Sequence, residues 1–461
     1  MYARISPHQF SGTFRIPASK SHTIRRLLMA ALAEGVSEIG YPLDSLDARS
    51  CVAFCRALGA VVEEHRGRDD QCANPADANG EKLLRWTVTG IAGRRALAGS
   101  TLPIDVGNSG TTLFLALGIA ALGTGDITLT GDEQLRRRSA APLLEALAHL
   151  GATVRSGPGG CAPVTIRGPW KGGKVSISCP TSQYLSSLLL AAPLAAAGIV
   201  TEIETPLLNE KPYIEMTLSY LDAQHILYEK AADLSWFRIP GGASYRPLNG
   251  SVPGDFSSAA FPGCAAAIGS LATGSLTGGA TLLGLDPDDT QGDKVFFDIL
   301  GKMGCTVRWE KLPVKEAAAE EWALVLSRTG PLHGGEFDLN ATPDMLPALA
   351  AVACYAEGDT ALVNVAHARI KETDRIAVMA AELGTLGCIV EERPDGLIIH
   401  GNGGRGIRGG VTVQGHGDHR VVMALAAAAL GANGPVTIDT AEVAAVTYPG
   451  FLELLGAQII E

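Results

Sequence analysis

The segment 369–375 concentrates charged side chains that could bind an anion and transfer protons. It reads Arg-Ile-Lys-Glu-Thr-Asp-Arg, so five of its seven residues are charged, in a chain where 18% are. An apolar run at helical spacing follows, which predicts that the segment lies at the start of a helix. Lys371 and Arg375 would then lie at the positive end of the helix dipole, where a cation costs roughly 0.3–1 kcal/mol. Either an anion binds nearby, or the segment is a solvated ion-pair turn capped by Thr373.

The composition excludes several classes of partner. The chain has 461 residues, of which 46% are hydrophobic, and a net charge of −11, which argues against nucleic acid and anionic membranes as partners. No run reaches the roughly 18 apolar residues of a membrane span, and the N-terminus lacks the pattern of a signal peptide. We therefore expect a cytoplasmic protein. Cys51 and Cys55 fall on an apolar helix, which favours buried thiols over a disulfide or a metal site.

Two alternating patterns form the scaffold that must position the charged groups. In the first, a polar start leads into an Ala/Leu-rich helix, a Gly turn and a β-type run. In the second, an amphipathic helix ends in Leu-Gly-Ala or a variant, where Gly is typical of a left-handed helix C-cap, and a strand follows. The chain therefore reads as a six-fold repeat of an α/β unit, with three units in each of two domains. The copies of the first pattern are Ser21–Ile39, Asn108–Leu129, Ser182–Ile203, Asp255–Leu276, Asp344–Val363 and Asp418–Ile438.

The helices of the first pattern are apolar nearly all round, so we expect them to be central and buried. Their polar residues gather at the N-terminal ends, where free N–H groups and a positive field favour anions. If these ends face one cleft, added Lys and Arg, including the run 136–138, make it cationic and suited to small anionic substrates. Within it, Glu372 and Asp344 are candidates for acid–base catalysis. The polar residues at the helix starts are Lys20, Ser21, Arg25, Asn108, Ser109, Gly110, Thr111, Thr181, Ser182, Gln183, Asp255, Ser257, Ser258, Asp344, Asp418, His419 and Arg420.

Taken together, these motifs resemble the enolpyruvyl transferase family, and within it the branch that acts on shikimate 3-phosphate. The match runs the whole length of the chain in the order of the family. The matching segments are Ser19-Lys20-Ser21 with Arg25, Asp44-Ser45-x-Asp47, 107–111, 129–131, Ser182-Gln183, Lys211-Pro212-Tyr213, Gly254-Asp255, Pro343-Asp344, 371–375 and Asp418-His419-Arg420.

The resemblance implies an inside-out α/β barrel in two domains, each built from three βαβαββ-like repeats, with the active site in the cleft between them. The N-terminal strand belongs with the C-terminal domain in this family. One domain would therefore comprise residues 1–18 and 253–461, on the phosphoenolpyruvate carboxylate side. The other would be the inserted, acceptor-binding residues 19–252, with hinges near 18–19 and 252–253.

The resemblance also implies the reaction, which is transfer of the enolpyruvyl group of phosphoenolpyruvate to the 5-hydroxyl of shikimate 3-phosphate in aromatic amino acid biosynthesis, with release of phosphate. Neither a cofactor nor a metal is implied, and we expect a monomer. Glu372 would protonate the methylene carbon and later take a proton back, while Asp344, helped by Lys20, would accept the hydroxyl proton. The residues implied for phosphoenolpyruvate are Lys20, Gly110, Arg138, Gln183, Arg375 and Arg420. The residues implied for the acceptor are Ser21, Arg25, Thr181, Ser182, Gln183, Tyr213, Asp344 and Lys371.

Three positions depart from the family pattern and leave alternatives open. Val446 stands where the family has a Lys, Phe114 where it has an Arg, and Glu210 where a Ser contacts the acceptor phosphate. A carboxylate beside a phosphate dianion is repulsive by several kcal/mol, on the order expected from Coulomb's law, unless it is protonated or turned away. One alternative is therefore an enzyme of this fold acting on a different, possibly unphosphorylated, cyclic acceptor. The other is a non-catalytic paralogue that binds a sugar-like anion.

Overall fold

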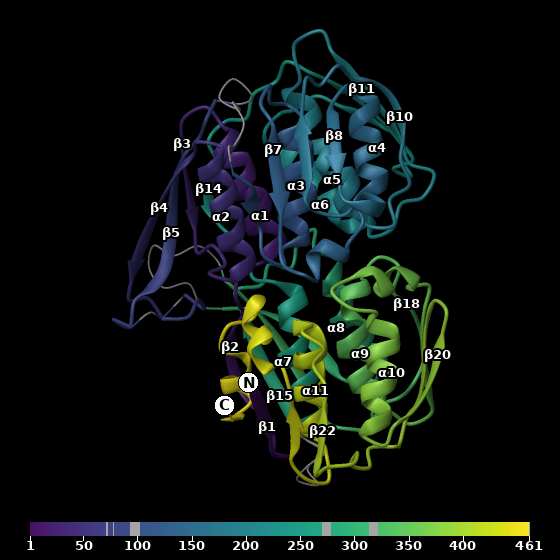
Figure 1. Ribbon diagram of the computed structural model, residues 1–461. Helices are drawn as coiled ribbons and strands as arrows, with labels where there is room; N and C mark the ends of the chain where they lie inside the picture. The colour runs from purple at the N-terminus through teal and green to yellow at the C-terminus, as the bar shows by residue number, and fades with distance from the viewer. Residues whose placement is uncertain (71, 77, 93–101, 270–277, 313–320, 461) are drawn as a thin grey trace. The chain divides into compact units, whose positions relative to one another are not determined.

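The computed structural model describes residues 1–70, 72–76, 78–92, 102–269, 278–312 and 321–460. Two compact units are present (Figure 1). The terminal unit comprises Met1–Ser19 and Pro253–Glu461, and the insert unit comprises Lys20–Val252. The β-type run expected after the helix in the copy Asp255–Leu276 falls on residues 270–276, which lie outside the described residues.

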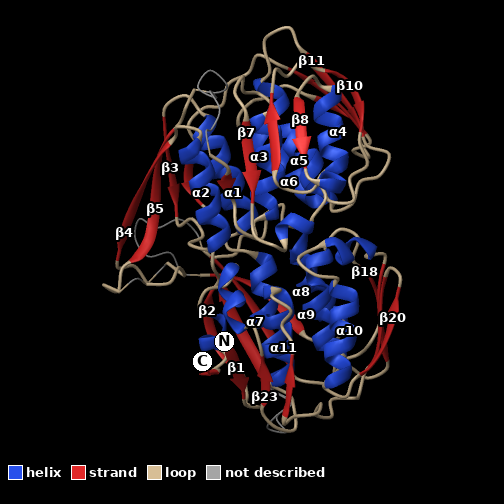
Figure 2. Ribbon diagram, viewed as in Figure 1, coloured by secondary structure: helices blue, strands red, loops and turns tan. Residues whose placement is uncertain are grey.

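The sheets formed by the described residues share one pairing pattern. Each has four strands, of which the first two are parallel and the remaining two pairs antiparallel. A parallel pair needs a crossover connection, and in four of these sheets a single helix, α3, α5, α9 or α11, supplies it. The chain therefore has an α/β fold, and helices lie between the sheets within each unit (Figure 2).

The insert unit contains three of these sheets and six α-helices. The sheets, in strand order, are β14 (Asn249–Ser251), β3 (Val36–Gly40), β5 (Lys82–Thr89) and β4 (Val61–Gly67); β6 (Ile104–Asp105), β7 (Ile127–Thr130), β9 (Val164–Arg167) and β8 (Thr153–Ser156); and β10 (Gly173–Ser176), β11 (Val200–Glu204), β13 (Trp236–Pro240) and β12 (Glu229–Lys230). The helices are α1 (Lys20–Leu32), α2 (Leu46–Ala57), α3 (Gly110–Ala120), α4 (Ala141–His149), α5 (Ser182–Ala191) and α6 (Lys211–Ala223). These counts refer to the described part of the unit.

The terminal unit repeats the arrangement in its own described residues. Its sheets are β2 (Ser11–Arg15), β15 (Gly278–Leu283), β17 (Trp322–Arg328) and β16 (Thr306–Lys311); β18 (Glu336–Asp338), β19 (Asp359–Val363), β21 (Gly396–His400) and β20 (Ile389–Arg393); and β22 (Val411–Val413), β23 (Val436–Ile438), β1 (Tyr2–Ile5) and β24 (Gln458–Ile460). Its helices are α7 (Phe256–Gly269), α8 (Val295–Lys302), α9 (Leu346–Ala353), α10 (Arg375–Thr385), α11 (His419–Ala429) and α12 (Phe451–Leu454). In Figure 1, α9 and α10 lie against the sheet of β18 and β20.

Helices of the first sequence pattern form the cores, as predicted. Every residue of α3, α7, α9 and α11 is buried. In the terminal unit α7, α9 and α11 contact one another, and in the insert unit α3 contacts both α1 and α5. Small side chains dominate these helices, which lets their backbones approach closely. The polar side chains at their starts are thereby held at fixed positions by fully packed helices.

Glycines end the amphipathic helices of the second pattern, as the Leu-Gly-Ala motif predicts. Gly59, Gly151 and Gly387 follow α2, α4 and α10 with φ of 101°, 106° and 82°. A residue with a Cβ is strained at such a φ, whereas glycine is not. Where the copy at 221–224 lacks a glycine, His225 takes a φ of 56° after α6.

Two strand pairings bring distant parts of the chain together. The N-terminal strand β1 pairs with β23 and with β24, so the two ends of the chain lie in one sheet of the terminal unit (Figure 1). Where the chain leaves and re-enters the terminal unit, the Ser19 N–H donates to the Pro253 carbonyl at 2.8 Å, and the Asp255 N–H donates to the Pro17 carbonyl at 2.9 Å. The two backbone segments that lead into and out of the insert unit therefore lie side by side.

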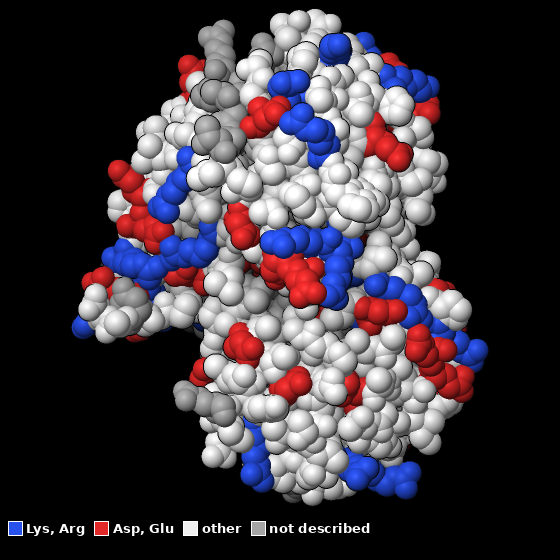
Figure 3. Space-filling view, in the orientation of Figure 1, with Lys and Arg blue, Asp and Glu red and all other residues white. Residues whose placement is uncertain are grey.

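On the face drawn in Figure 3, acidic and basic side chains lie next to one another in mixed clusters. Among the described residues, no helix combines the length and the apolar character that crossing a membrane requires. The Cys51 and Cys55 side chains are buried in α2, as the sequence predicts.

Candidate active site

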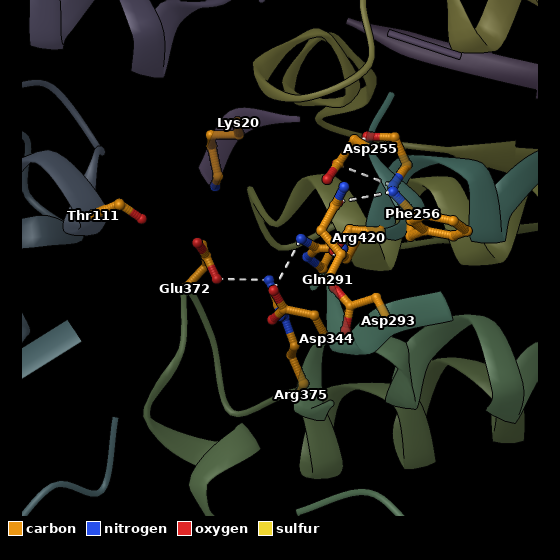
Figure 4. A network of polar contacts seen from close by, with 12 residues as sticks. Lys20, Thr111, Asp255, Phe256, Gln291, Asp293, Asp344, Glu372, Arg375 and Arg420 are labelled. Atoms are coloured by element: carbon orange, nitrogen blue, oxygen red, sulfur yellow. Dashed lines mark hydrogen bonds and ion pairs between the residues drawn. The ribbon is translucent and has the colours of Figure 1, made fainter. Parts of the chain in front are cut away.

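A buried arginine organises the charged group of the terminal unit. Arg375 is the first residue of α10, and its side chain is fully buried. Its guanidinium donates to Asp418 through Nε (2.8 Å), to Asp344 through Nη1 (2.7 Å) and to Glu372 through Nη2 (2.6 Å) (Figure 4). Burial lowers the pKa of Arg375, but the three carboxylates outweigh it and hold that pKa well above its ordinary value. This arginine therefore stays charged at any working pH.

Helix caps fix the loops that carry these carboxylates. Asp374 is the N-cap of α10 and accepts from the Ala377 N–H, so the predicted cap Thr373 is wrong. The Thr373 hydroxyl instead donates to Asp418 Oδ2 at 3.1 Å. Asp418 is itself the N-cap of α11 and accepts from the Arg420 N–H at 2.9 Å. One fully buried aspartate therefore joins the starts of α10 and α11.

Asp344 lies between two guanidinium groups. It belongs to the short helical turn Pro343–Met345 before α9, and it contacts Arg375 Nη1 at 2.7 Å and Arg420 Nη2 at 2.9 Å. Burial would raise the pKa of Asp344, but the charges of Arg420, Lys371 and Arg375 outweigh it and hold that pKa far below its usual range. Asp344 is therefore an ionised carboxylate that two arginines grip as they would grip a bound carboxylate ligand.

The start of α7 carries a polar network that sequence reasoning missed. The Phe256 N–H donates to Gln291 Oε1 at 3.0 Å, and Gln291 Nε2 donates to the Gly254 carbonyl and to Asp289 (2.9 and 2.7 Å). The Ser257 hydroxyl donates to Asp293. Figure 4 shows Gln291 and Asp293 beside Phe256. The many polar residues in 286–293 could have indicated this network. Polar side chains that follow a strand can form hydrogen bonds to the start of a neighbouring helix.

In the insert unit, Lys20 and Asp47 form an ion pair. Lys20 is the first residue of α1, and its Nζ lies 3.1 Å from Asp47 Oδ2 in the first turn of α2. The Asp47 side chain is only 6% exposed and that of Lys20 14%. The two motifs that carry these residues, Ser19-Lys20-Ser21 and Asp44-Ser45-x-Asp47, are thus brought together.

Three residues predicted for phosphoenolpyruvate meet at the starts of α3 and α5. A Cβ at Gly110 would lie 2.4 Å from Arg138 Nη1, so a larger residue would displace the guanidinium from this position. Gln183 Nε2 donates to the Thr111 hydroxyl at 3.2 Å, which joins α5 to the first turn of α3. Gly110, Arg138 and Gln183 therefore gather around the start of α3.

Arg25, predicted for the acceptor, is buried and bonded to protein groups. Its Nε donates to the Thr217 hydroxyl at 2.9 Å, and its terminal nitrogens donate to the Ser21 and Tyr213 carbonyls at 3.2 and 3.3 Å. Burial lowers the pKa of Arg25 to about 10, against the raising influence of Tyr220, Tyr213 and Glu210. Arg25 is therefore charged at neutral pH, and it ties α1 to α6 beside Ser21 and Tyr213.

Two further residues predicted for the acceptor donate to an acidic side chain. Glu210 Oε2 accepts from the Thr181 hydroxyl at 3.1 Å, from the Ser182 N–H at 2.9 Å and from the Ser182 hydroxyl at 2.8 Å. Thr181 is the N-cap of α5, and Glu210 immediately precedes α6. The Glu210 carboxylate thus accepts hydrogen bonds from hydroxyl groups that the family resemblance assigned to binding of the acceptor.

The other two departures from the family pattern have plain packing consequences. Phe114 is 4% exposed, and its ring packs edge-on against that of Tyr184 at a centroid distance of 5.2 Å. An apolar contact between α3 and α5 thus stands where the family pattern has a cation. Val446 ends the helical turn Ala441–Val446 and is partly exposed.

The described residues contain no group of three or more His, Cys, Asp and Glu side chains that could hold a metal ion. What they offer are two buried arginines with adjacent carboxylates in the terminal unit, and lysine, arginine, hydroxyl and amide groups in the insert unit. Such groups can bind anions and move protons.

Comparisons with known proteins agree with this chemistry. The family model described as EPSP synthase (3-phosphoshikimate 1-carboxyvinyltransferase) matches residues 6–455. The chain is 45% identical over 457 residues to a 3-phosphoshikimate 1-carboxyvinyltransferase of Acetivibrio thermocellus, covering 99% of this chain and 97% of that protein. It is 39% identical to one from Halobacterium salinarum, covering 99% and 98%. The EPSP synthase structure from Acinetobacter baumannii matches all of both chains with a TM-score of 0.77 at 28% identity. The chain therefore belongs to the EPSP synthase family.

Proposed function

We propose that this transferase moves the carboxyvinyl group of phosphoenolpyruvate to the 5-hydroxyl of 3-phosphoshikimate and releases phosphate. The observation that carries the proposal is the arginine–carboxylate cluster of Arg375, Arg420, Asp344 and Glu372, in a chain that belongs to this family along its whole length. Relatives that bear the name of this activity are 39–45% identical to the chain. Both substrates are small anions, which suits the charged groups described above.

Phosphoenolpyruvate binding would rearrange the pairing of Asp344. We propose that Arg375 and Arg420 bind the carboxylate of phosphoenolpyruvate, for which guanidinium forks are well shaped. In the structure the same two groups contact Asp344 at 2.7 and 2.9 Å. A substrate carboxylate that takes over these donors neutralises the charges that depress the pKa of Asp344, so that pKa rises. Donor binding would thereby convert Asp344 from an inert carboxylate into a base.

The reaction then proceeds by addition and elimination. Glu372 gives a proton to the methylene carbon, and the acceptor hydroxyl oxygen bonds to the adjacent carbon while its proton goes to Asp344, helped by Lys20. In the second step the bond between that carbon and the bridging phosphate oxygen breaks. Glu372 takes a proton back from the methyl group, and the double bond re-forms. Protons and the phosphate leaving group move in these two steps, and there is no net oxidation or reduction. The proposal includes neither a cofactor nor a metal.

The insert unit would supply the rest of the site. Lys20 and Arg138 are proposed to bind the phosphate of phosphoenolpyruvate, with Gly110 and Gln183 beside them. The positions of Arg138, Gly110 and Gln183 around the start of α3 support their part of this proposal. The acceptor would contact Ser21, Arg25, Thr181, Ser182, Gln183, Tyr213, Asp344 and Lys371. Two anions repel each other, so cations from both units are needed to hold them together.

We also propose that the two units are domains that close on a shared cleft in an inside-out α/β barrel. The domains would be residues 1–18 with 253–461 and residues 19–252, with hinges near 18–19 and 252–253. The two compact units, which divide after Ser19 and after Val252, support these limits. The common strand order of the sheets supports three repeats in each domain.

A phosphate-release assay tests this function. Purified protein should release phosphate only when both phosphoenolpyruvate and 3-phosphoshikimate are present. Glu372→Gln, which cannot return a proton, should lower kcat by about 10²–10⁴-fold, and the matched change Glu453→Gln at an exposed position of α12 should not. Release without the acceptor, or full activity of Glu372→Gln, would refute the assignment. The alternative of a different acceptor is not favoured, because the named relatives share the full length of the chain.

A further inference from the structure

Glu210 is a buried acidic residue with a left-handed backbone conformation. It precedes α6 with a φ of 57°, a left-handed conformation, and it is 2% exposed. Buried carboxylates cost several kcal/mol unless hydrogen bonds or cations compensate, by the general rule for buried charges. Some of that compensation comes from the Thr181 and Ser182 donors at 2.8–3.1 Å. More comes from the charge of Arg25, whose pKa is raised by Glu210 against the larger lowering by burial.

The donors that hold Glu210 are of the kind that bind a phosphate group. Two hydroxyls and a backbone N–H converge on one Oε2 atom, next to a buried guanidinium bonded to Ser186 and Thr217. An acceptor phosphate that bound to Thr181 and Ser182 would accept hydrogen bonds from the same donors that now bind Glu210. The carboxylate and the phosphate carry like charges, so they cannot share these donors at close range.

We propose that the Glu210 carboxylate competes with the phosphate of the acceptor for Thr181 and Ser182, and so lowers the affinity of the enzyme for its phosphorylated acceptor. The proposal rests on the proposed function above. Binding of the acceptor requires the Glu210 side chain to leave these donors, and the free energy of breaking its hydrogen bonds is subtracted from the binding free energy. Glu210 is then a residue that sets acceptor affinity and does not take part in the chemical steps.

Substitution of Glu210 separates this role from a structural one. Glu210→Ser removes the competing charge, and we expect the KM for 3-phosphoshikimate to fall at least tenfold, or about 1.4 kcal/mol. The KM for phosphoenolpyruvate should stay within about twofold, because Glu210 accepts from Thr181 and Ser182, which are predicted for the acceptor and not for phosphoenolpyruvate. Glu215→Ser, at an exposed position of α6, is the matched control and should change neither constant.

A purely structural role predicts the opposite result. If Glu210 only anchors the start of α6 to α5, Glu210→Ser raises the KM for 3-phosphoshikimate or leaves it unchanged, and the proposal is overturned. Glu210→Gln keeps the size and removes the charge, so it serves if the serine variant does not fold, and its KM for the acceptor should also fall.

Binding of inorganic phosphate keeps the test independent of the proposed function. If the wild-type protein shows no turnover, that function fails, and calorimetric titration with inorganic phosphate still decides the question about Glu210. Tighter phosphate binding by Glu210→Gln than by the wild type supports the competition. Equal or weaker binding overturns it.

Discussion

Replacing Arg375 by methionine should be among the most damaging single changes in the terminal unit. Methionine approximates the length of the arginine stem but removes the charge, so Asp418 is left buried without its cation. Both Arg375 and Asp418 side chains are 0% exposed, and they share contacts of 2.8 and 3.2 Å. Water cannot replace the lost partner at such a site.

The expected loss follows from the burial of each partner. Removing one member of a buried pair costs about 3–5 kcal/mol because it leaves an uncompensated charge. The Asp344 and Glu372 side chains are 19% and 15% exposed, so they can regain some hydration, and Asp344 also keeps Arg420. Their losses should add about 0–1 kcal/mol each, the range of partly exposed pairs. We therefore expect a loss of about 3–7 kcal/mol, a large share of the 5–15 kcal/mol typical of a folded protein.

Urea denaturation followed by circular dichroism measures the loss, and amide hydrogen exchange should locate it at the starts of α10 and α11. The double variant with Asp418→Asn should recover about 1–3 kcal/mol relative to the sum of the single changes. The control is Arg393→Met, which breaks an exposed pair with Glu391 and should cost less than about 1 kcal/mol.

The pH dependence gives a second check on the same variant. In the wild type, burial raises the pKa of Asp418, but the charge of Arg375 has the larger, opposite effect. The pKa of Asp418 therefore lies below its ordinary value. Without Arg375, the effect of burial remains and raises the pKa of Asp418. Protonation of Asp418 then removes the free-energy cost of a buried charge. The deficit of Arg375→Met should shrink as the pH falls toward about 4, the ordinary carboxyl pKa. A deficit below about 1 kcal/mol that is independent of pH would refute the reasoning.

Two further predictions concern the stability of the protein in acid and the packing of Phe114. The folded-state pKa values of Asp344 and Asp418 lie below the unfolded value of about 3.9, so the stability they contribute is complete above that pH and is lost as the pH falls below it. The urea midpoint should therefore decline from about pH 5 to pH 3, and a constant midpoint would contradict the assignment. Phe114→Ala should destabilise the protein by about 3–5 kcal/mol, because a buried ring packed on Tyr184 is lost. A change in the free energy of unfolding below about 1 kcal/mol would show that the ring is not part of the core.

Much of the scaffold could be predicted from the sequence because helix periodicity and glycine C-caps are local signals. The apolar helices α3, α7, α9 and α11 are buried, and Gly59, Gly151 and Gly387 have the positive φ expected of C-caps. The pairing of β1 with β24 connects residues that are more than 450 positions apart, so no local sequence pattern predicts it. The family resemblance implied only that the N-terminal strand belongs with the C-terminal domain, and it named no partner strand.

The candidate site was harder to predict, because its partners come together only through tertiary packing. Charge spacing singled out Lys371, Glu372 and Arg375, but it pointed to an external anion. The structure adds Asp418 from another helix start, and the network around Gln291 has no distinctive motif. The direction of the Glu210 side chain likewise depends on its left-handed backbone, which sequence alone does not reveal. Internal carboxylates thus occupy donors that the sequence assigned to substrates, at Arg375 with Arg420 and at Thr181 with Ser182.

The most direct test of the central claim is the fate of the bridging oxygen of phosphoenolpyruvate. Transfer of the carboxyvinyl group forms a bond between the acceptor oxygen and carbon, so the bridging oxygen must leave with phosphate. With phosphoenolpyruvate labelled by ¹⁸O at that position and 3-phosphoshikimate as acceptor, mass spectrometry should find the label in inorganic phosphate and an unlabelled carboxyvinyl ether as the product. Label retained in pyruvate, with unchanged 3-phosphoshikimate, would mean hydrolysis at phosphorus and would contradict the account.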